Sequence, residues 1–253
     1  MRKRIGVAVA LAGLVALSSV HAQTTDFFGL VSAGTPQQVQ NAINQGAKPN
    51  AQDKVGWTPL MFAAKYNPNS EVVTVLIDAG ANVEDRSKGG TSALMAAAGG
   101  TFNPEVITVL LRAGAKVEDR DADFTTPLMV AAAYNPNPTV ILALLTGGAK
   151  VDDQAPGGIT PLIMAASRTS NPGVITELLK AGAKFDSRDP NGRTPLMHAA
   201  ENNQNPEVIT TLLKAGADGK AKDSAGKTAF DYAQDNENLK GTDAYRQLQE
   251  ASQ

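Results

Sequence analysis

The side chains that could carry out chemistry in this sequence are few. The 253 residues include no cysteine, which excludes disulfides, thiolate metal sites and cysteine nucleophiles. There are two histidines, His21 and His198, and His21 lies in a segment that we expect to be removed. A chain left with one histidine is a poor candidate for zinc binding or histidine-based catalysis, and serine or threonine nucleophiles would lack a base. We therefore predict that the protein is not an enzyme, with no catalytic residues and no cofactor.

Carboxylates are the second group that could bind or react. They gather in the segments between the predicted helices, at Glu84/Asp85, Glu118/Asp119, Asp121, Asp123 and Asp152/Asp153. Oxygen ligands of this kind can hold calcium. No segment matches the EF-hand pattern, however, and Arg86 and Arg120 stand beside the carboxylates. We therefore favour a solvated ladder of ion pairs and predict no metal site, and we interpret His198 as a polar residue tucked between structural units.

The elements that must position these residues are copies of one unit, seen most clearly in residues 194–217. Thr194-Pro195 and Asn205-Pro206 are two helix starts, because threonine and asparagine are N-cap residues and proline is tolerated in a first helical turn. Apolar residues at helical spacing follow each start. Gly216 can adopt the left-handed conformation that ends the second helix. The unit is therefore a helix, a turn, a second helix and a glycine cap.

This unit recurs along the chain with a step of 34 residues. The residues at the first helix start are Thr58, Ser92, Thr126, Thr160, Thr194 and Thr228, and the terminal glycines are Gly46, Gly80, Gly114, Gly148, Gly182 and Gly216. Neither helix is long enough to be stable alone, so each unit must be covered by the next. The pattern predicts a solenoid, in which each unit contacts mainly its two neighbours. The leucine and isoleucine pairs of the second helices, such as Leu144/Leu145, are expected to form its continuous spine.

A period of 34 residues is also that of the tetratricopeptide repeat, but the repeated Thr-Pro-Leu, Ala-Ala and Gly-Ala positions resemble the ankyrin repeat. The resemblance covers about Asp26 to Leu248. Two features depart from it: the unit is one residue longer than usual, and the histidine of the Thr-Pro-Leu-His motif is replaced by an apolar residue. The replacing residues are Met61, Met95, Met129, Ile163 and Met197. The resemblance implies an all-α solenoid of helix-turn-helix units joined by β-turn loops, and we identify the chain as an exported, bacterial-type ankyrin-repeat protein.

Residues 1–22 have the pattern of a secretory signal peptide. Arg2, Lys3 and Arg4 precede the apolar stretch 5–17, and small residues precede a cleavage site after Ala22. The apolar stretch is short for a bilayer span, although a retained interfacial anchor is the alternative. We therefore predict a periplasmic or secreted protein with no membrane insertion after cleavage.

The mature chain is predicted to be one ankyrin-repeat domain. Its expected parts are an N-terminal cap at 26–52, five full repeats at about 53–222 and a C-terminal cap at 223–253, within residues 23–253. Loss of the three basic residues of the signal changes the formal charge from 23 minus 25 to 20 minus 25, which is −5. A mildly acidic chain is a poor partner for nucleic acid, so we predict no nucleic-acid binding.

A binding surface is expected where exposed positions change from unit to unit, because positions held constant by packing say little about partners. In ankyrin proteins, turn tips and the ends of first helices line a concave groove that binds other proteins. By this resemblance, the candidate protein-binding residues are Trp57, Lys65, Tyr66, Tyr134, Ile159, Arg168 and Arg193. Tryptophan, tyrosine and arginine are also enriched at binding hot spots. The alternative for Trp57 is that it folds over the neighbouring turn while the tyrosines prop the loops.

The sequence thus predicts an exported, monomeric, non-catalytic scaffold that binds another protein of unknown identity through its concave groove. Three alternatives are kept. The scaffold could hold a small-molecule, calcium or enzymatic site. The acidic turns and Phe124 are the only features of the sequence that suggest this alternative. It could be a structural or protective component of the cell envelope, or it could be a secreted effector.

Overall fold

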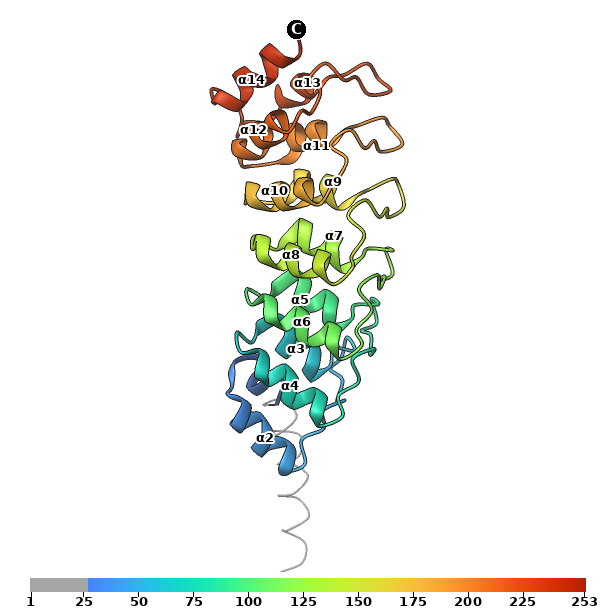
Figure 1. The fold of residues 1–253 in the computed structure, drawn as a ribbon, viewed down its shortest axis with the longest axis vertical. Helices are drawn as coiled ribbons and strands as arrows, with labels where there is room; N and C mark the ends of the chain where they lie inside the picture. The colour runs from blue at the N-terminus through green and yellow to red at the C-terminus, as the bar shows by residue number, and fades with distance from the viewer. Residues whose placement is uncertain (1–26) are drawn as a thin grey trace, which may run out of the picture.

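The computed structural model describes residues 27–253, so the predicted signal peptide and its cleavage site lie outside the described residues. The helices stack in pairs in a single row from the N-terminal to the C-terminal end, and the turns between pairs project from one side of the row (Figure 1). This is the solenoid that the 34-residue period predicts. Within residues 27–253, every helix is too short or too polar to cross a membrane.

Each full unit contains a first helix of 8 residues and a second helix of 9 residues. We number these units one to five from residues 53, 87, 121, 155 and 189. Their helices are α3 (Pro59–Tyr66), α4 (Ser70–Asp78), α5 (Ala93–Gly100), α6 (Pro104–Arg112), α7 (Pro127–Tyr134), α8 (Pro138–Thr146), α9 (Pro161–Arg168), α10 (Pro172–Lys180), α11 (Pro195–Asn202) and α12 (Pro206–Lys214). Before them, residues 27–33 are helical and are followed by α2 (Pro36–Asn44). After them come α13 (Ala229–Ala233) and α14 (Asp243–Ala251).

The helix starts are those expected from the N-cap residues. The hydroxyl of Thr194 accepts a hydrogen bond from the N–H of Met197, and the amide oxygen of Asn205 accepts one from the N–H of Glu207 at 3.0 Å. Each bond satisfies an N–H that the helix itself leaves unpaired. The second helices end before glycines of positive φ, such as Gly216 at 100°.

The core is a continuous apolar column, but only half of the expected spine belongs to it. The first leucine of each pair is fully buried, namely Leu76, Leu110, Leu144, Leu178 and Leu212. The second member, such as Leu145 beside Leu144, is only partly buried. The expected spine is therefore complete for the first member only, because adjacent helical residues point in directions about 100° apart, while the second member is partly buried against the core.

Methionines fill the place of the family's histidines, as the sequence predicts. Met61, Met95, Met129 and Met197 are buried inside the stack, and the sulfur of Met197 even accepts a hydrogen bond from the N–H of Thr194 at 3.4 Å. In the C-terminal cap, Asp231 stands at the equivalent position, and its carboxylate accepts a hydrogen bond from the backbone N–H of Thr228 at 2.7 Å.

Buried asparagines supply a polar network between units that the sequence analysis did not identify. The side-chain amide of Asn135 donates to the carbonyl oxygens of Ala98 at 3.0 Å and Thr101 at 2.8 Å, both in the preceding unit. Its amide oxygen accepts the N–H of Asn137 at 2.9 Å. The same arrangement is found at Asn67, Asn203 and Asn236. These bonds satisfy carbonyl oxygens at the ends of first helices, where the helix itself leaves them free.

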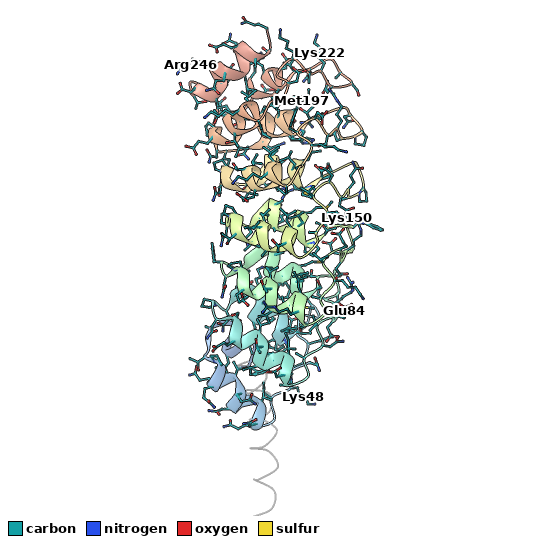
Figure 2. The ribbon with its side chains drawn as sticks, viewed as in Figure 1. Lys48, Glu84, Lys150, Met197, Lys222 and Arg246 are labelled. Atoms are coloured by element: carbon teal, nitrogen blue, oxygen red, sulfur yellow. The ribbon has the colours of Figure 1, made fainter. Side chains whose placement is uncertain are left out.

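The acidic turns form the ion-pair ladder favoured by the sequence. Arg86 pairs with Asp119 in the next unit, and Lys116 pairs with Glu84. Figure 2 shows Glu84, Lys150 and Lys222 on the side of the projecting turns and Arg246 on the opposite side. No group of three or more histidine or carboxylate side chains within residues 27–253 is arranged to hold a metal ion.

Candidate protein-binding surface

We use the name inner surface for the turn tips together with the accessible sides of the first helices α3, α5, α7, α9 and α11. The predicted binding residues fall into three groups on it. Trp57, Lys65 and Tyr66 lie in unit one, Tyr134, Ile159 and Arg168 in units three and four, and Arg193 in unit five.

The first group is an aromatic cluster. The rings of Trp57 and Phe62 meet edge to face at 5.3 Å between centroids, and Phe62 also contacts Phe28 at 5.1 Å and Tyr66 at 6.2 Å. The ammonium of Lys65 lies 5.3 Å from the Trp57 centroid and 5.1 Å from that of Tyr66. Trp57 is only partly accessible, because its indole packs against Phe62 in the first helix of its own unit. Tyr66, in contrast, is 53% exposed.

Small residues separate this cluster from the second group. The first helix of unit two ends in Gly99 and Gly100. A Cβ atom on Gly100 would collide with the side chain of Lys65, so the glycine lets that lysine lie across the next unit. Unit two therefore contributes no large side chain at the end of its first helix.

The second group joins units three and four. A guanidinium N–H of Arg168 donates to the hydroxyl of Tyr134 at 2.8 Å, and the guanidinium carbon lies 5.5 Å from the centroid of the same ring. Tyr134 is 61% exposed and Arg168 is exposed as well. The pair is thus a preformed projection made of a cation stacked on an aromatic ring.

A hollow of about 490 Å³ lies beside this pair, between units four and five. The residues that line it are Ile159, Ile163, Met164, Ser167, Arg168, His198 and Asn202. Its unit-four side is largely apolar, and its rim carries hydroxyl, amide and guanidinium groups. Two of the predicted binding residues, Ile159 and Arg168, therefore share one hollow.

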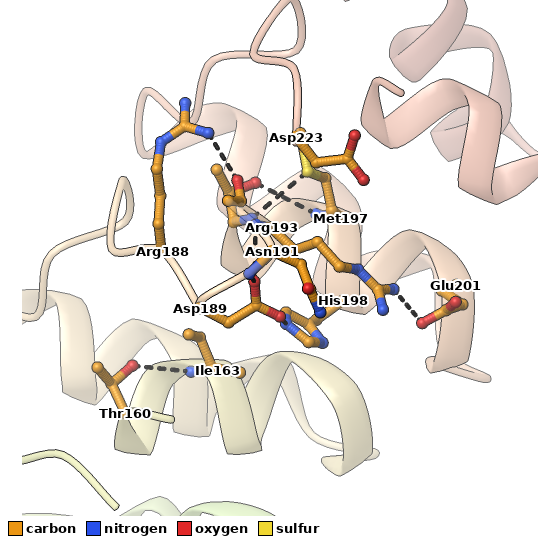
Figure 3. A network of polar contacts seen from close by, with 12 residues as sticks. Thr160, Ile163, Arg188, Asp189, Asn191, Arg193, Met197, His198, Glu201 and Asp223 are labelled. Atoms are coloured by element: carbon orange, nitrogen blue, oxygen red, sulfur yellow. Dashed lines mark hydrogen bonds and ion pairs between the residues drawn. The ribbon is translucent and has the colours of Figure 1, made fainter. Parts of the chain in front are cut away.

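The third group is a polar network in unit five and the C-terminal cap (Figure 3). Arg193 forms an ion pair with Glu201, and its guanidinium carbon lies 4.4 Å from the centroid of the Tyr232 ring. The hydroxyl of Tyr232 donates to Asp223 at 2.5 Å, which raises the pKa of Tyr232 to about 12. The hydrogen bond from Tyr232 lowers the pKa of the Asp223 carboxyl in turn. Arg193 therefore has its charge balanced within the chain.

His198 belongs to the same network and joins a turn to a helix. Its Nε2 lies 3.1 Å from Oδ2 of Asp189, while Oδ1 of Asp189 accepts the backbone N–H groups of Asn191 and Arg193, both at 2.9 Å. The side chain of His198 is 12% exposed. Burial, followed by the positive charge of Arg193, lowers the pKa of His198 despite the opposing effect of Asp189. His198 faces unit four across the hollow, but its hydrogen-bond partner Asp189 lies in its own unit and not in a neighbouring one.

The turn of unit four is tied less firmly to the following turn than the others are. In the preceding junction, Arg120 pairs with Asp153 at 2.5 Å and also donates to the carbonyl oxygen of Gln154 at 3.4 Å. In the following junction, Arg188 donates to the carbonyl oxygen of Lys222 at 2.9 Å. We call these bonds from an arginine to the next turn the arginine clamp. Between units four and five, Gln154 stands at the position of Arg120 and Arg188, so the arginine clamp is missing there.

A backbone hydrogen bond between successive turns is missing at the same junction. In the next junction, the N–H of Ser224 donates to the carbonyl oxygen of Asn191 at 2.8 Å. Pro190 takes the place of that donor between units four and five and has no N–H. Across the described chain, no hydrogen bond connects the turns 155–159 and 189–193.

The sequence analysis missed one variable column of the inner surface, the fourth residue after each helix start. This column contains Phe62, Ala96, Val130, Met164, His198 and Tyr232. Phe62 contacts Trp57, Tyr232 contacts Arg193, and Met164 lines the same hollow as Ile159 and Arg168. Their change from unit to unit is the signal that could have identified them.

Comparison with known proteins agrees with this architecture. A family model described as ankyrin repeats in three copies matches residues 28–121, 99–189, 128–223 and 164–244. The crystal structure of the human ASB11 ankyrin repeat domain is similar, with a TM-score of 0.74 and 24% sequence identity over 89% of this chain and 96% of that chain. An identity at this level shows a shared fold alone. None of the curated proteins compared with the chain matches it.

Proposed function

This chain belongs to the ankyrin-repeat family, and on that premise we propose that it binds another protein through its inner surface, without catalysing a reaction. Ankyrin repeats are in general protein-interaction scaffolds. The inner surface corresponds to the concave groove of the family. A stack of packed helix pairs is a preformed surface that loses little conformational entropy when a partner binds.

The observation that carries this proposal is the exposure of large side chains on that surface. The large side chains of Tyr66, Tyr134 and Arg168 are all exposed on this surface. Side chains of these types supply much of the binding energy in protein interfaces. Trp57 and Arg193 have partners within the chain, so their proposed role is to support the surface at its two ends.

Affinity capture tests this proposal. We compare the tagged wild type with the triple variant Tyr66→Ala, Tyr134→Ala, Arg168→Ala, whose positions are all exposed and therefore tolerate truncation. The matched control carries Phe102→Ala, Leu142→Ala and Arg112→Ala, which remove exposed side chains away from the turn tips and first-helix faces. We expect the first variant to lose a partner that the wild type and the control both retain. Identical partners for all three proteins, with unchanged melting temperatures, would refute the assignment of the surface.

We also propose that the protein is exported and acts in the periplasm or outside the cell. The support is the pattern of residues 1–22, a basic start, an apolar stretch and small residues before Ala22. Cell fractionation followed by mass determination tests this proposal, with a chain starting at Gln23 expected outside the cytoplasm. An uncleaved chain in the cytoplasm would contradict it. No observation in the described residues favours a calcium, small-molecule or enzymatic role over protein binding.

A further inference from the structure

We propose that the hollow between units four and five is the anchor of the inner surface, where a partner inserts one large apolar side chain and sets a neighbouring carboxylate against Arg168. This inference deepens the proposed function and rests on it. The partner segment is a peptide with an apolar residue and an adjacent aspartate, glutamate or terminal carboxylate.

The apolar part of the inference comes from the unit-four side of the hollow. Ile163 is 2% exposed and forms its base, while Ile159 and Met164 are partly accessible. Methionine has a flexible, polarizable side chain that adapts to different apolar groups. The volume of about 490 Å³ lies in the range of about 300 to 1,000 Å³ typical of sites for small ligands. One side chain with its flanking backbone fits such a space.

The carboxylate part comes from the balance of charges around the rim. Arg193 is paired with Glu201, and His198 is hydrogen-bonded to Asp189. Arg168 has no carboxylate partner within residues 27–253, and its contact with the Tyr134 hydroxyl uses only one of its five N–H donors. The hollow therefore combines an apolar pocket with one unbalanced guanidinium, which binds carboxylates in a bidentate manner.

The wall that carries Ile159 can adjust to an occupant. The turn 155–159 has neither the arginine clamp nor the backbone hydrogen bond to the turn 189–193. It also has Ala155 where the other turns have an aspartate or, in unit two, Ser87, whose side-chain oxygen accepts N–H groups of the turn, as that of Asp189 does. Movement of this wall changes the width of the hollow without breaking a hydrogen bond between turns.

Methionine methyl NMR of the intact chain tests the inference, because Met164 is the only methionine in residues 27–253 that is not buried. The buried methionines Met61, Met95, Met129 and Met197 act as internal controls. The probes are three acetylated and amidated tetrapeptides, Gly-Leu-Asp-Gly, Gly-Leu-Asn-Gly and Gly-Ser-Asp-Gly. Each is titrated to about 10 mM, well above the dissociation constant of about 1 mM that corresponds to roughly −4 kcal/mol.

We expect Gly-Leu-Asp-Gly to shift the Met164 methyl signal with saturation and to leave the buried methionines unchanged. The asparagine peptide should bind about 5-fold more weakly, because a charged hydrogen bond is replaced by a neutral one. The serine peptide should produce no saturable shift. In Arg168→Gln the aspartate and asparagine peptides should bind equally, whereas the control Arg112→Gln, which changes the net charge by the same amount, should keep the difference.

The inference is overturned if no peptide shifts Met164 with saturation, or if the aspartate and asparagine peptides bind equally to the wild type. Its failure is distinguishable from failure of the proposed function. Loss of a captured partner in the inner-surface variant without a Met164 response leaves the function standing and removes the anchor. A Met164 response with unchanged capture leaves the peptide site standing and removes its role in partner binding.

Discussion

At the scale of single residues, His198 is held in place by the fold and its protonation state depends on that fold. Its side chain lies against Asp189, with Arg193 and Glu201 as the other charged groups around it. Burial and Arg193 lower its pKa below the ordinary 6.5. The unfolded chain therefore takes up a proton at this position at a higher pH than the folded chain does.

This difference predicts how stability changes with pH. Because the unfolded state binds more protons, the contribution of His198 is fully present above pH 6.5 and is lost as the pH falls through the folded-state pKa. We expect the free energy of unfolding of the wild type to fall as the pH drops from 6.5, and that of His198→Gln to fall less. Urea denaturation at a series of pH values measures it, and equal slopes for the two proteins would contradict the prediction.

Phe124 is the residue that departs from its column in the turns. It has a φ of 60°, while the equivalent positions are glycines such as Gly90 and Gly192 with φ of 82° and 76°. The left-handed conformation costs a residue with a Cβ about 1 to 2 kcal/mol. The ring is 57% exposed, so little packing offsets this cost.

Replacing Phe124 by glycine should therefore stabilise the fold by up to about 1 kcal/mol, since some of the gain is lost to the greater freedom of glycine in the unfolded chain. Phe124→Ala keeps the Cβ and is the control that removes only the ring. Chemical denaturation of the three proteins checks the order. A glycine variant no more stable than the alanine variant would show that the strain is absent.

At the scale of elements, the weakest connection between turns is the one at which Gln154 replaces arginine. Ser187, at the position of the paired aspartates Asp119 and Asp153, has a buried hydroxyl without a hydrogen-bond partner. The same junction thus lacks both members of the ion pair found in the two preceding ones. Its looseness is a property of particular side chains and not of the repeat as such.

Restoring both members should tighten the junction. We expect the double variant Gln154→Arg, Ser187→Asp to have a free energy of unfolding about 1 kcal/mol higher than the wild type. This is the upper end of the contribution measured for exposed ion pairs. In a domain of this size, this corresponds to roughly 2 to 4 °C in melting temperature. Hydrogen exchange should slow in the turns 155–159 and 189–193. Gln52→Arg, in a junction that already has a backbone hydrogen bond, is the control and should change exchange less.

At the scale of the whole molecule, stability is carried by contacts between neighbouring units. Leu144 and Leu142 lie on the same helix, but Leu144 is fully buried against its neighbours and Leu142 is 51% exposed. Leu144→Ala should lower the free energy of unfolding by about 2 to 5 kcal/mol, whereas Leu142→Ala should change it by about 0.5 kcal/mol or less.

The distribution of this effect along the stack is also predicted. Because each unit contacts mainly its neighbours, hydrogen exchange in Leu144→Ala should rise most in units two to four and least in α14. A uniform rise over all units would mean that the stack unfolds as one cooperative block.

The sequence by itself determined the period, the helix starts and ends, and the family resemblance, because these depend on local residue types such as Thr194, Pro195 and Gly216. Residues that cap or break a helix act on their own backbone, whatever surrounds them. The same holds for the methionines that replace the histidines of the motif.

Only the tertiary structure decided which side chains have partners across units. Phe62 turned out to pack on Phe28, Arg168 to bond to Tyr134, and Asn135 to bond to the preceding unit. These contacts depend on the stacking of one unit on another and on which way each side chain points. Periodicity places a residue on a face of its helix, but the neighbour that lies opposite is set by three-dimensional packing.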